Sequence, residues 1–325
     1  MLAMRAEAFD EVITAGARER IAGLVELVGP VPIAAEWPPH PRLGGVAVLI
    51  TGWGSPPVDV ELLDSMPNLE LVVHAAGTVK DHLAIDVWER GIRVSSAATI
   101  VNSPVSKFTV AAIILAAKRA LPLARQYSEH GFGTRREKIG SSVFDRTVGV
   151  VGASRIGRDV IRELTELGLE VLVYDPLLEP AEAGRLGATS VGIDDLCRRS
   201  DIVTVHAPSL PSTHRLLDAR RLALLADGSI VINTARGRLI DTDALTAECA
   251  TGRIDAVLDV TDPEPLPPEH PLLRMPNVLV TPHIAGANGA DAELIGHFVA
   301  DELERYCAGM PLVGLVDPGR LEVSA

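Results

Sequence analysis

Apolar positions along the first hundred residues alternate between helical spacing and short β-branched runs. Each strand-like run is followed by small or turn-forming residues, and the first helical run stops before a Gly-Pro pair. This alternation predicts a small α/β domain with a parallel sheet. The runs are, in order, helical from Ile13 to Leu27, strand-like at Val46–Ile50, helical around Glu61–Leu63, strand-like at Leu71–Val73, helical at His82–Glu89 and strand-like at Ile92–Val94.

A long apolar-periodic segment follows. Ser103 is a helix-capping residue type, and Pro104 suits the first position of a helix, so we expect a helix from there to about Ser128. The glycine-rich and charged stretch Gly131–Ser142 is typical of a loop.

From Thr147 onward the alternation becomes strict. Near-continuous apolar strands separated by helices are typical of a parallel sheet covered on both faces, whose ligands bind outside the carboxyl ends of the strands. A further amphipathic helix is expected at Asp291–Cys307, and residues 311–325 are expected to return to the first domain. The predicted strands are Val148–Val151, Val171–Tyr174, Ile202–Val205, Ile230–Asn233, Ala256–Leu258 and Val278–Val280, and the helices between them include Ile156–Leu167, Arg215–Leu225 and Thr242–Ala250.

Composition narrows the class of protein. The chain has 325 residues, 47% hydrophobic and 22% charged, which excludes a wholly disordered or fibrous protein and suggests two domains. Its formal net charge of −13 disfavours nucleic-acid and membrane partners. Charged residues interrupt the first ten positions, so we expect no signal segment, and the apolar run Phe108–Ala117 is too short for a span. Three scattered cysteines argue against disulfides and a cysteine zinc site and favour a cytoplasmic protein with no metal.

A glycine turn between a predicted strand and helix marks a candidate nucleotide site. Gly152 permits the tight turn, Gly157 permits close packing of helix on strand, and N–H groups at the helix start suit a pyrophosphate. Ser154 replaces the middle glycine of G-x-G-x-x-G, and its Cβ is expected to crowd the phosphate. Asp175 ends the next strand, where a carboxylate favours a ribose 2′-hydroxyl and hence NAD over NADP. The alternative for Asp175 is a plain turn cap.

Three ionisable residues follow three successive predicted strands. Arg236 offers a donor fork that matches a carboxylate, His283 can move a proton near neutral pH, and Glu264 can orient that histidine. Each of these residues comes one strand-to-strand crossover after the previous one. We therefore expect all three to meet in one crevice.

Several ordered motifs together resemble the D-2-hydroxyacid dehydrogenase family, over nearly the whole chain and most strongly from Thr147 to Gly286. The stretches that carry the resemblance are GASRIG, VYDP, TVHAPSLPSTHRLLD, INTARGRLIDTDAL, LDVTDPEPLPPEHPL and NVLVTPHIAG.

The resemblance implies roles for individual residues. Arg236 would bind the substrate carboxylate and carbonyl, His283 would be the acid/base and Glu264 its partner. The loop Gly77, Thr78 and Val79 would present backbone N–H groups to the substrate carboxylate. The residues implied to contact the cofactor are Thr78, Gly152, Ser154, Arg155, Ile156, Gly157, Asp175, His206, Ala207, Pro208, Thr213, Thr234, Ala235, Arg236, Asp259, His283, Ala285 and Gly286.

The same resemblance implies an α/β fold of two domains, in which a Rossmann-type doubly wound parallel sheet (residues 104–294) is inserted into a smaller flavodoxin-like α/β substrate domain (residues 1–103 and 295–325). It also implies an NAD-dependent hydride transfer to or from a small 2-oxo or 2-hydroxy acid, and a homodimer formed through the long helix after Pro104.

The sequence departs from the family pattern at Ser154, at Val79-Lys80, where a Gly-Val pair is common, and at Lys107, where an acidic residue is usual. His74 and Trp53 could each line the substrate pocket or serve the fold, and Lys80 could bind a second anionic group or be solvated. Two other functions stay open: an NAD-sensing binding protein of transcriptional complexes, and a phosphonate or formate oxidoreductase of the same superfamily.

Overall fold

The computed structural model describes residues 1–28, 37, 42–80, 82–131 and 143–323. Contacts between Cα atoms divide the chain into two compact units. Unit 1 comprises Met1–Pro104 and Gly286–Ser324, and unit 2 comprises Val105–Ala285. The chain passes from unit 1 to unit 2 after Pro104, one residue later than predicted. It returns to unit 1 at Gly286, nine residues before the predicted return at residue 295, because the segment from Gly286 already packs in unit 1, where the Gly289 N–H donates to Glu11 at 3.0 Å.

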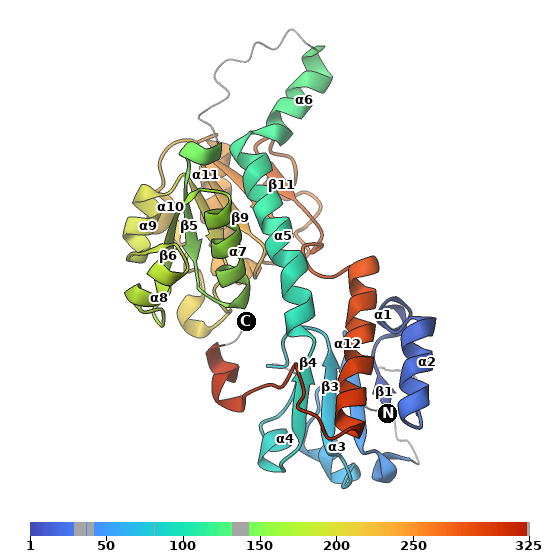
Figure 1. Cartoon of the computed structure of the whole chain (residues 1–325). Coiled ribbons are helices and arrows are strands. Elements are labelled where there is room, and N and C mark those ends of the chain that lie inside the picture. Colours follow the sequence, from blue (N-terminus) through green and yellow to red (C-terminus); the bar gives the residue numbers. More distant parts are fainter. Residues whose placement is uncertain (29–36, 38–41, 81, 132–142, 324–325) are drawn as a thin grey trace. The chain divides into compact units, whose positions relative to one another are not determined.

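Unit 1 is built on a four-stranded parallel sheet in the order β1-β2-β3-β4. Phe9 of α1 and Ile295 of α12 pack on one face, while Leu62 of α3 and Val87 of α4 pack on the other. Figure 1 shows α12 lying alongside the sheet with α1 and α2. The strands are β1 (Leu2–Ala3), β2 (Val48–Gly52), β3 (Leu71–Ala75) and β4 (Arg93–Ser96), and the helices are α1 (Ala6–Val12), α2 (Ala15–Leu24), α3 (Val60–Ser65), α4 (Asp86–Glu89) and α12 (Ala290–Cys307).

The C-terminal segment returns to unit 1, as predicted. Leu315 forms an antiparallel bridge with Ser95, beside β4. The buried carboxylate of Glu302 accepts hydrogen bonds from the N–H groups of Val313 at 2.8 Å and Gly314 at 3.1 Å. A buried carboxylate needs such donors, so Glu302 anchors this segment to α12.

Unit 2 is built on a seven-stranded parallel sheet in the order β11-β10-β9-β8-β5-β6-β7. The order reverses between β5 and β8, which is the switch point of a doubly wound Rossmann sheet. The strands are β5 (Thr147–Val151), β6 (Glu170–Tyr174), β7 (Thr189–Ser190), β8 (Ile202–Val205), β9 (Ser229–Asn233), β10 (Ile254–Leu258) and β11 (Val278–Val280). The helices are α5 (Ala98–Ala117, which begins in unit 1), α6 (Ala120–His130), α7 (Arg155–Glu166), α8 (Pro180–Arg185), α9 (Ile193–Arg199), α10 (Ala219–Leu222) and α11 (Thr242–Ala250).

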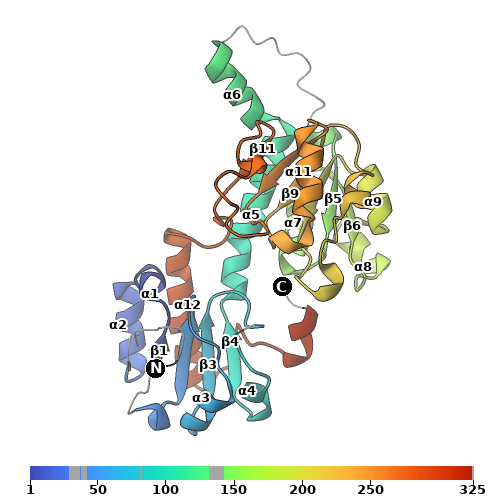
Figure 2. The same ribbon diagram turned by 180° about the vertical axis from the view of Figure 1, so that it is seen from behind.

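Alternate strand residues of unit 2 enter two separate cores. Val231 of β9 packs with residues of α9, α10 and α11, whereas its neighbours Ile230 and Ile232 pack with residues of α5, α7 and α8. The near-continuous apolar strands therefore serve two buried faces, which confirms the predicted sheet class. Figure 2 shows α11 and α9 on the face that is turned away in Figure 1.

The prediction that a helix starts at Ser103-Pro104 is wrong. α5 begins at Ala98, whose N–H donates to Ser96 Oγ at 3.1 Å, and Pro104 lies inside the helix. The helix also ends earlier than expected, at Ala117, because Arg119 adopts a left-handed conformation with φ 50° before α6 starts. Gly131 caps α6 with φ 63°, and the remainder of the predicted loop, residues 132–142, lies outside the described residues.

The predicted helix Ile13–Leu27 shortens to α2, because the backbone of Ile13 and Thr14 is not helical and the chain becomes extended at Val25. The helix α1 precedes this range and was not predicted. Other predicted helices shorten, so that Arg215–Leu225 contains only α10 and His82–Glu89 only α4. The two-residue strands β1 and β7 and the short helices α8 and α9 were not predicted.

Among the described residues one helix, α5, is long and apolar enough to cross a membrane by length and composition alone. The core helix of a soluble protein meets the same criteria. Val110, Ile113 and Ala117 of α5 pack into the core of unit 2, whereas Ile114 and Leu115 of the same helix are exposed.

Candidate active site

Three neighbouring strands of unit 2 carry the three predicted catalytic residues at their carboxyl ends. Arg236 follows β9, Glu264 follows β10 and His283 follows β11, and these strands lie side by side in the sheet. Parallel strands end at one edge, so the order of the sheet places all three loops next to one another.

His283 and Glu264 are in direct contact. The distance between His283 Nδ1 and Glu264 Oε1 is 2.6 Å, and about half of the imidazole is exposed (52%), as is 40% of the carboxylate side chain. An ionised carboxylate can only accept, so this contact places a proton on Nδ1 and turns Nε2 toward other partners. The arrangement suits proton transfer at Nε2.

Asp259, at the end of β10, holds the loop that carries His283. Its buried carboxylate accepts from Thr281 Oγ1 at 2.6 Å, from the Ile284 N–H at 2.8 Å and from the Ala285 N–H at 2.9 Å. The loop also places His283 at φ 56°. Both oxygens of Asp259 are thus used within the protein, so its first role is to orient the histidine loop. Sequence analysis assigned Asp259 only to the cofactor.

The loops of Arg236 and Glu264 also touch. A Cβ on Gly237 would lie 2.0 Å from the carbonyl carbon of Thr261 and 2.5 Å from the Asp262 nitrogen, so only glycine fits beside the arginine. Thr242 Oγ1 donates to the Asp262 carbonyl at 2.8 Å and adds a second link. No sequence signal other than the glycine itself pointed to this packing.

Arg236 is exposed, and its Nη1 donates to the Ala235 carbonyl at 2.7 Å. Within the described ranges the guanidinium forms no ion pair. Its positive charge is therefore available to an anionic ligand, as the carboxylate role requires.

The glycine turn has the geometry that a dinucleotide site needs. Gly152 has φ 100°, and a Cβ there would lie 2.5 Å from the Ala207 nitrogen, while a Cβ on Gly157 would lie 2.1 Å from the Gly152 carbonyl oxygen. Neither position therefore accepts a side chain. At the start of α7, the N–H groups of Arg155 and Ile156 donate to no group that the structure describes. They are free for a pyrophosphate, so these residues fit NAD.

Ser154 is the helix cap of α7. Its Oγ accepts from the Gly157 N–H at 3.3 Å, so the hydroxyl satisfies a backbone donor of the first turn. This assigns the serine a structural task, and its expected crowding of a phosphate stays a prediction.

Asp175 joins the glycine turn to the end of β6. Its Oδ2 accepts from the Ala153 N–H at 2.7 Å, and its Oδ1 accepts from the Leu177 N–H at 2.8 Å. The structure thus contains the turn cap that was the alternative for this residue, and it places the carboxylate beside the turn as well. A carboxylate oxygen accepts more than one hydrogen bond, so the ribose role stays a prediction.

The remaining predicted residues of unit 2 lie in the segments after β8, β9 and β11. His206 is buried and its Nε2 lies 2.9 Å from Thr204 Oγ1, while Ala207 packs on the glycine turn. Thr213 Oγ1 donates to the Pro208 carbonyl at 2.6 Å, so that hydroxyl stabilises the loop after β8. Thr234 Oγ1 lies 2.8 Å from Thr109 Oγ1 of α5. Cofactor contacts by Ala235, Ala285 and these residues stay predictions.

The predicted carboxylate loop Gly77–Val79 follows β3 in unit 1. Ser96 Oγ donates to the Gly77 carbonyl at 2.6 Å, and the Val79 carbonyl accepts from the N–H groups of His82 at 3.1 Å and Leu83 at 3.0 Å. Thr78 and Gly286 also belong to unit 1, and their predicted contact with a cofactor stays a prediction.

Two of the unusual residues now have partners. Lys107 Nζ lies 3.0 Å from Glu163 Oε1 of α7, so the lysine ties α5 to α7 inside unit 2. Lys80 donates through its N–H to Thr78 Oγ1 at 3.3 Å. Trp53 is partly buried and packs in the core of unit 1, which favours the structural role for this residue.

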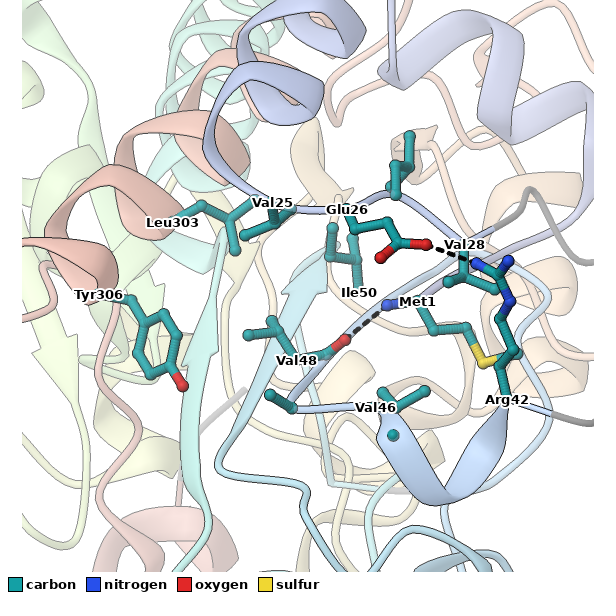
Figure 3. Close-up of a pocket in the computed structure, with 13 residues that line it drawn as sticks. Met1, Val25, Glu26, Val28, Arg42, Val46, Val48, Ile50, Leu303 and Tyr306 are labelled. Atoms are coloured by element: carbon teal, nitrogen blue, oxygen red, sulfur yellow. Dashed lines mark hydrogen bonds and ion pairs between the residues drawn. The ribbon is translucent and has the colours of Figure 1, made fainter.

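A cavity of about 590 Å³ lies elsewhere in unit 1, bordered by the start of the chain, β2 and α12. Figure 3 shows Glu26 paired with Arg42 at 2.6 Å on one side and Tyr306 on the other. Among the described residues, its lining includes no histidine. Among the described residues no three histidine, cysteine or acidic side chains gather as metal ligands.

Comparisons with known proteins identify relatives of this chain. Residues 110–285 match the family model described as D-isomer specific 2-hydroxyacid dehydrogenase, NAD binding domain. The chain is 33% identical over 270 residues to D-3-phosphoglycerate dehydrogenase of Archaeoglobus fulgidus (82% of this chain, 51% of the relative). It is 32% identical over 274 residues to glyoxylate reductase of Thermofilum pendens (82% and 80%). The chain spans about half the length of the phosphoglycerate dehydrogenases that it matches.

A solved structure of D-lactate dehydrogenase from Aquifex aeolicus, complexed with NAD and lactic acid, has the same fold, with a TM-score of 0.75, 24% identity and coverage of 95% of this chain and 96% of that chain.

Proposed function

The chain belongs to the D-isomer specific 2-hydroxyacid dehydrogenase family, with NAD as cofactor, and from this premise we propose that it transfers a hydride between NAD(H) and a small 2-oxo or 2-hydroxy acid. The observation that carries the proposal is the 2.6 Å contact between His283 and Glu264, in the loops next to that of Arg236, which forms no ion pair with any described residue. An acid–base pair and a free guanidinium are the two groups that reduction of a 2-oxo acid requires.

His283 is the proton donor in the direction of reduction. Glu264 accepts a hydrogen bond from Nδ1–H and stabilises the charged imidazole, so Nε2 can give its proton to the carbonyl oxygen of the substrate. In oxidation Nε2 takes the proton back. Bound NAD(H) supplies or receives the hydride, and the protein supplies position and charge.

Arg236 binds the substrate. A guanidinium forms two parallel hydrogen bonds with a carboxylate, and its charge stabilises the negative charge that develops on the carbonyl oxygen. The absence of an ion pair to Arg236 among the described residues supports this role, because no carboxylate there competes for its charge.

The loop Gly77–Val79 binds the substrate carboxylate through backbone N–H groups. Ser96 Oγ holds the Gly77 carbonyl, so the Thr78 N–H on the opposite edge of that peptide is left for a ligand, and the N–H groups of Gly77 and Val79 donate to no group in the described part of the chain.

Asp175 favours NAD over NADP, because its negative charge repels a 2′-phosphate. The hydrogen bond from the Ala153 N–H holds the Asp175 carboxylate beside the glycine turn, which supports this role.

The protein acts in the cytoplasm as a homodimer joined through α5 and α6. Ile114, Leu115 and Tyr127 are 36%, 51% and 52% exposed, which is unusual for large apolar side chains on neighbouring helices. Figures 1 and 2 show α6 projecting away from the sheet of unit 2. We expect a second copy of the chain to bury this surface in a symmetric dimer. Sedimentation of the wild type and of Leu115→Glu separates a dimer from a monomer.

Steady-state oxidation of NADH and NADPH with a panel of 2-oxo acids tests the reaction. We expect turnover of at least one acid with NADH preferred, and a loss of kcat/KM of about 10³-fold or more in Arg236→Ala with NADH affinity nearly unchanged. Arg238→Ala, an exposed arginine two positions away, is the matched control and should keep wild-type rates.

NADH binding without turnover of any acid would instead identify a cofactor-sensing protein. Activity confined to formate or a phosphonate would assign the chain to another branch of the superfamily. Wild-type turnover in Arg236→Ala would remove the arginine from the mechanism.

A further inference from the structure

The start of α7 offers three consecutive backbone N–H groups that have no partner among the described residues. They belong to Ser154, Arg155 and Ile156, whereas the next N–H, that of Gly157, donates to Ser154 Oγ at 3.3 Å. Adjacent donors at the positive end of a helix suit the phosphates of a dinucleotide. They act together only if the peptides that carry them are held in one orientation.

Arg158 of α7 holds the carbonyl oxygens of two neighbouring peptides in this turn. Its side-chain Nε donates to the Ala153 carbonyl at 2.9 Å, and its backbone N–H donates to the Ser154 carbonyl at 2.9 Å. The second bond is the ordinary helical one, whereas the first depends on the arginine side chain. In a planar trans peptide the N–H points opposite to the C=O. The N–H groups of Ser154 and Arg155 are therefore directed away from the bonds that Arg158 makes.

The guanidinium of Arg158 is itself anchored. Its Nη1 donates to Glu182 Oε1 of α8 at 2.5 Å, and about a third of each of these two side chains is exposed. A planar guanidinium that is bound at both Nε and Nη1 keeps one orientation. Ala153 is held from its other edge as well, because its N–H donates to Asp175 Oδ2 at 2.7 Å. Ala153 is thus fixed between α7 and the end of β6.

We infer that Arg158 is a positioning residue for the pyrophosphate of NAD: its side chain holds the Ala153 carbonyl and so turns the Ser154 N–H, on the opposite edge of that peptide, toward the phosphates. Arg158 acts through the peptide and not through its charge, because that charge is paired with Glu182. The inference requires NAD as the cofactor and does not depend on the proposed hydride transfer.

Arg158→Met tests the inference, because it removes the donor to Ala153 and keeps a long unbranched side chain that suits a helix. We expect Kd for NADH to rise about ten-fold or more, while kcat at saturating NADH changes less than about three-fold. Kd for ADP, which has a pyrophosphate, should rise by a similar factor. Kd for adenosine, which has none, should change less than about three-fold. Titration of NADH fluorescence, and its displacement by ADP or adenosine, measures these constants without turnover.

Two further variants separate positioning from other effects. Arg162→Met makes the same change one turn later on α7, at an arginine whose Nη1 donates to Asp159 at 2.7 Å, and should leave Kd for NADH unchanged. Glu182→Gln leaves Arg158 in place with an acceptor for Nη1 but weakens its anchor, so Kd for NADH should rise about two- to five-fold. If Arg158 attracted the phosphates by its charge, loss of the neighbouring carboxylate would instead tighten NADH binding.

Tighter NADH binding in Glu182→Gln would therefore overturn the inference, even if Arg158→Met failed to fold. An unchanged NADH Kd in Arg158→Met, an equal loss in Arg162→Met, or an equal loss of adenosine and ADP affinity would overturn it as well. A protein that binds NADH with the expected pattern but reduces no acid would contradict the proposed function alone.

Discussion

His283 in unit 2 and His74 in unit 1 put the same side chain into opposite surroundings. His283 follows β11, is about half exposed and contacts a carboxylate at 2.6 Å, whereas His74 lies within β3, is 5% exposed and contacts a hydroxyl and another imidazole. An imidazole that meets solvent and a carboxylate can change its charge during a reaction. An enclosed neutral imidazole can only hold its neighbours. The partners of the ring therefore decide its task.

Removal of the His283 imidazole is the severest way to break this comparison. His283→Gln should lower kcat about 10³-fold, because glutamine keeps a hydrogen-bonding shape but cannot exchange a proton near neutral pH. Stopped-flow and steady-state NADH oxidation across pH 5–9 measure the effect. A variant that kept the wild-type pH–rate profile would show that the proton comes from elsewhere.

The carboxylate partner should matter less than the imidazole itself. Glu264→Gln removes the charge that favours the protonated ring but leaves a side-chain oxygen for Nδ1–H, so we expect kcat to fall about 10- to 100-fold. The pH profile should shift toward acid, since the charged imidazole loses its support. An unchanged pH–rate profile in Glu264→Gln would show that the glutamate does not act through His283.

The buried imidazoles of unit 1 should act on stability. Burial lowers the pKa of His74 to about 3 and that of His82 to about 4, while an unfolded histidine titrates near about 6.5. Below that pH the unfolded chain binds more protons than the folded one, so the free energy of unfolding is greatest above it and declines as pH falls toward 4. At pH 5 the loss is about 2 kcal/mol for each ring.

Tryptophan fluorescence in urea measures this decline, because Trp37, Trp53 and Trp88 all belong to unit 1. His74→Gln should show a smaller loss between pH 7 and pH 5, whereas Val72→Ala should lower stability equally at both. Equal pH dependence in His74→Gln and the wild type would contradict a neutral buried ring.

The smallest expected effect is at Ser154, which belongs to neither histidine region. It serves as a reference for the larger effects. Ser154→Ala removes the cap of α7 and should cost unit 2 about 1 kcal/mol or less, given the long 3.3 Å hydrogen bond. Ser154→Gly, which restores the common motif, should cost only a few tenths of a kcal/mol. Thermal unfolding followed by circular dichroism compares the two, and a large loss in both would show that the serine has a further partner.

Much of unit 2 could be predicted from its sequence. The β-branched strands read as a doubly covered parallel sheet because both faces are buried, and residues at strand ends such as Arg236 and His283 lie where that topology requires. The start of α5 could not, because Ser103-Pro104 carries a strong local signal for a helix start, while the true cap comes from Ser96, a strand residue.

The hydrogen-bond partners of Thr51, Asp259 and Asp175 could not be predicted from the sequence either. The contact of Thr51 with His74 joins positions 23 residues apart on neighbouring strands, and no local pattern encodes that register. Asp259 and Asp175 were assigned to the cofactor by motif, but their hydrogen bonds to backbone N–H groups depend on the loop conformation. Periodicity predicts which residues are buried, whereas hydrogen-bond partners follow only from the folded backbone.

The hydrogen bonds of Asp259 affect how much conformational entropy the His283 loop loses when a ligand binds. A non-glycine residue at φ 56° is disfavoured by roughly 1 kcal/mol, and a free loop would relax away from it. The three hydrogen bonds to the Asp259 carboxylate hold Thr281, Ile284 and Ala285 on either side of His283, so the loop loses its freedom when the chain folds. Ligand binding then proceeds without a second entropic penalty at this loop.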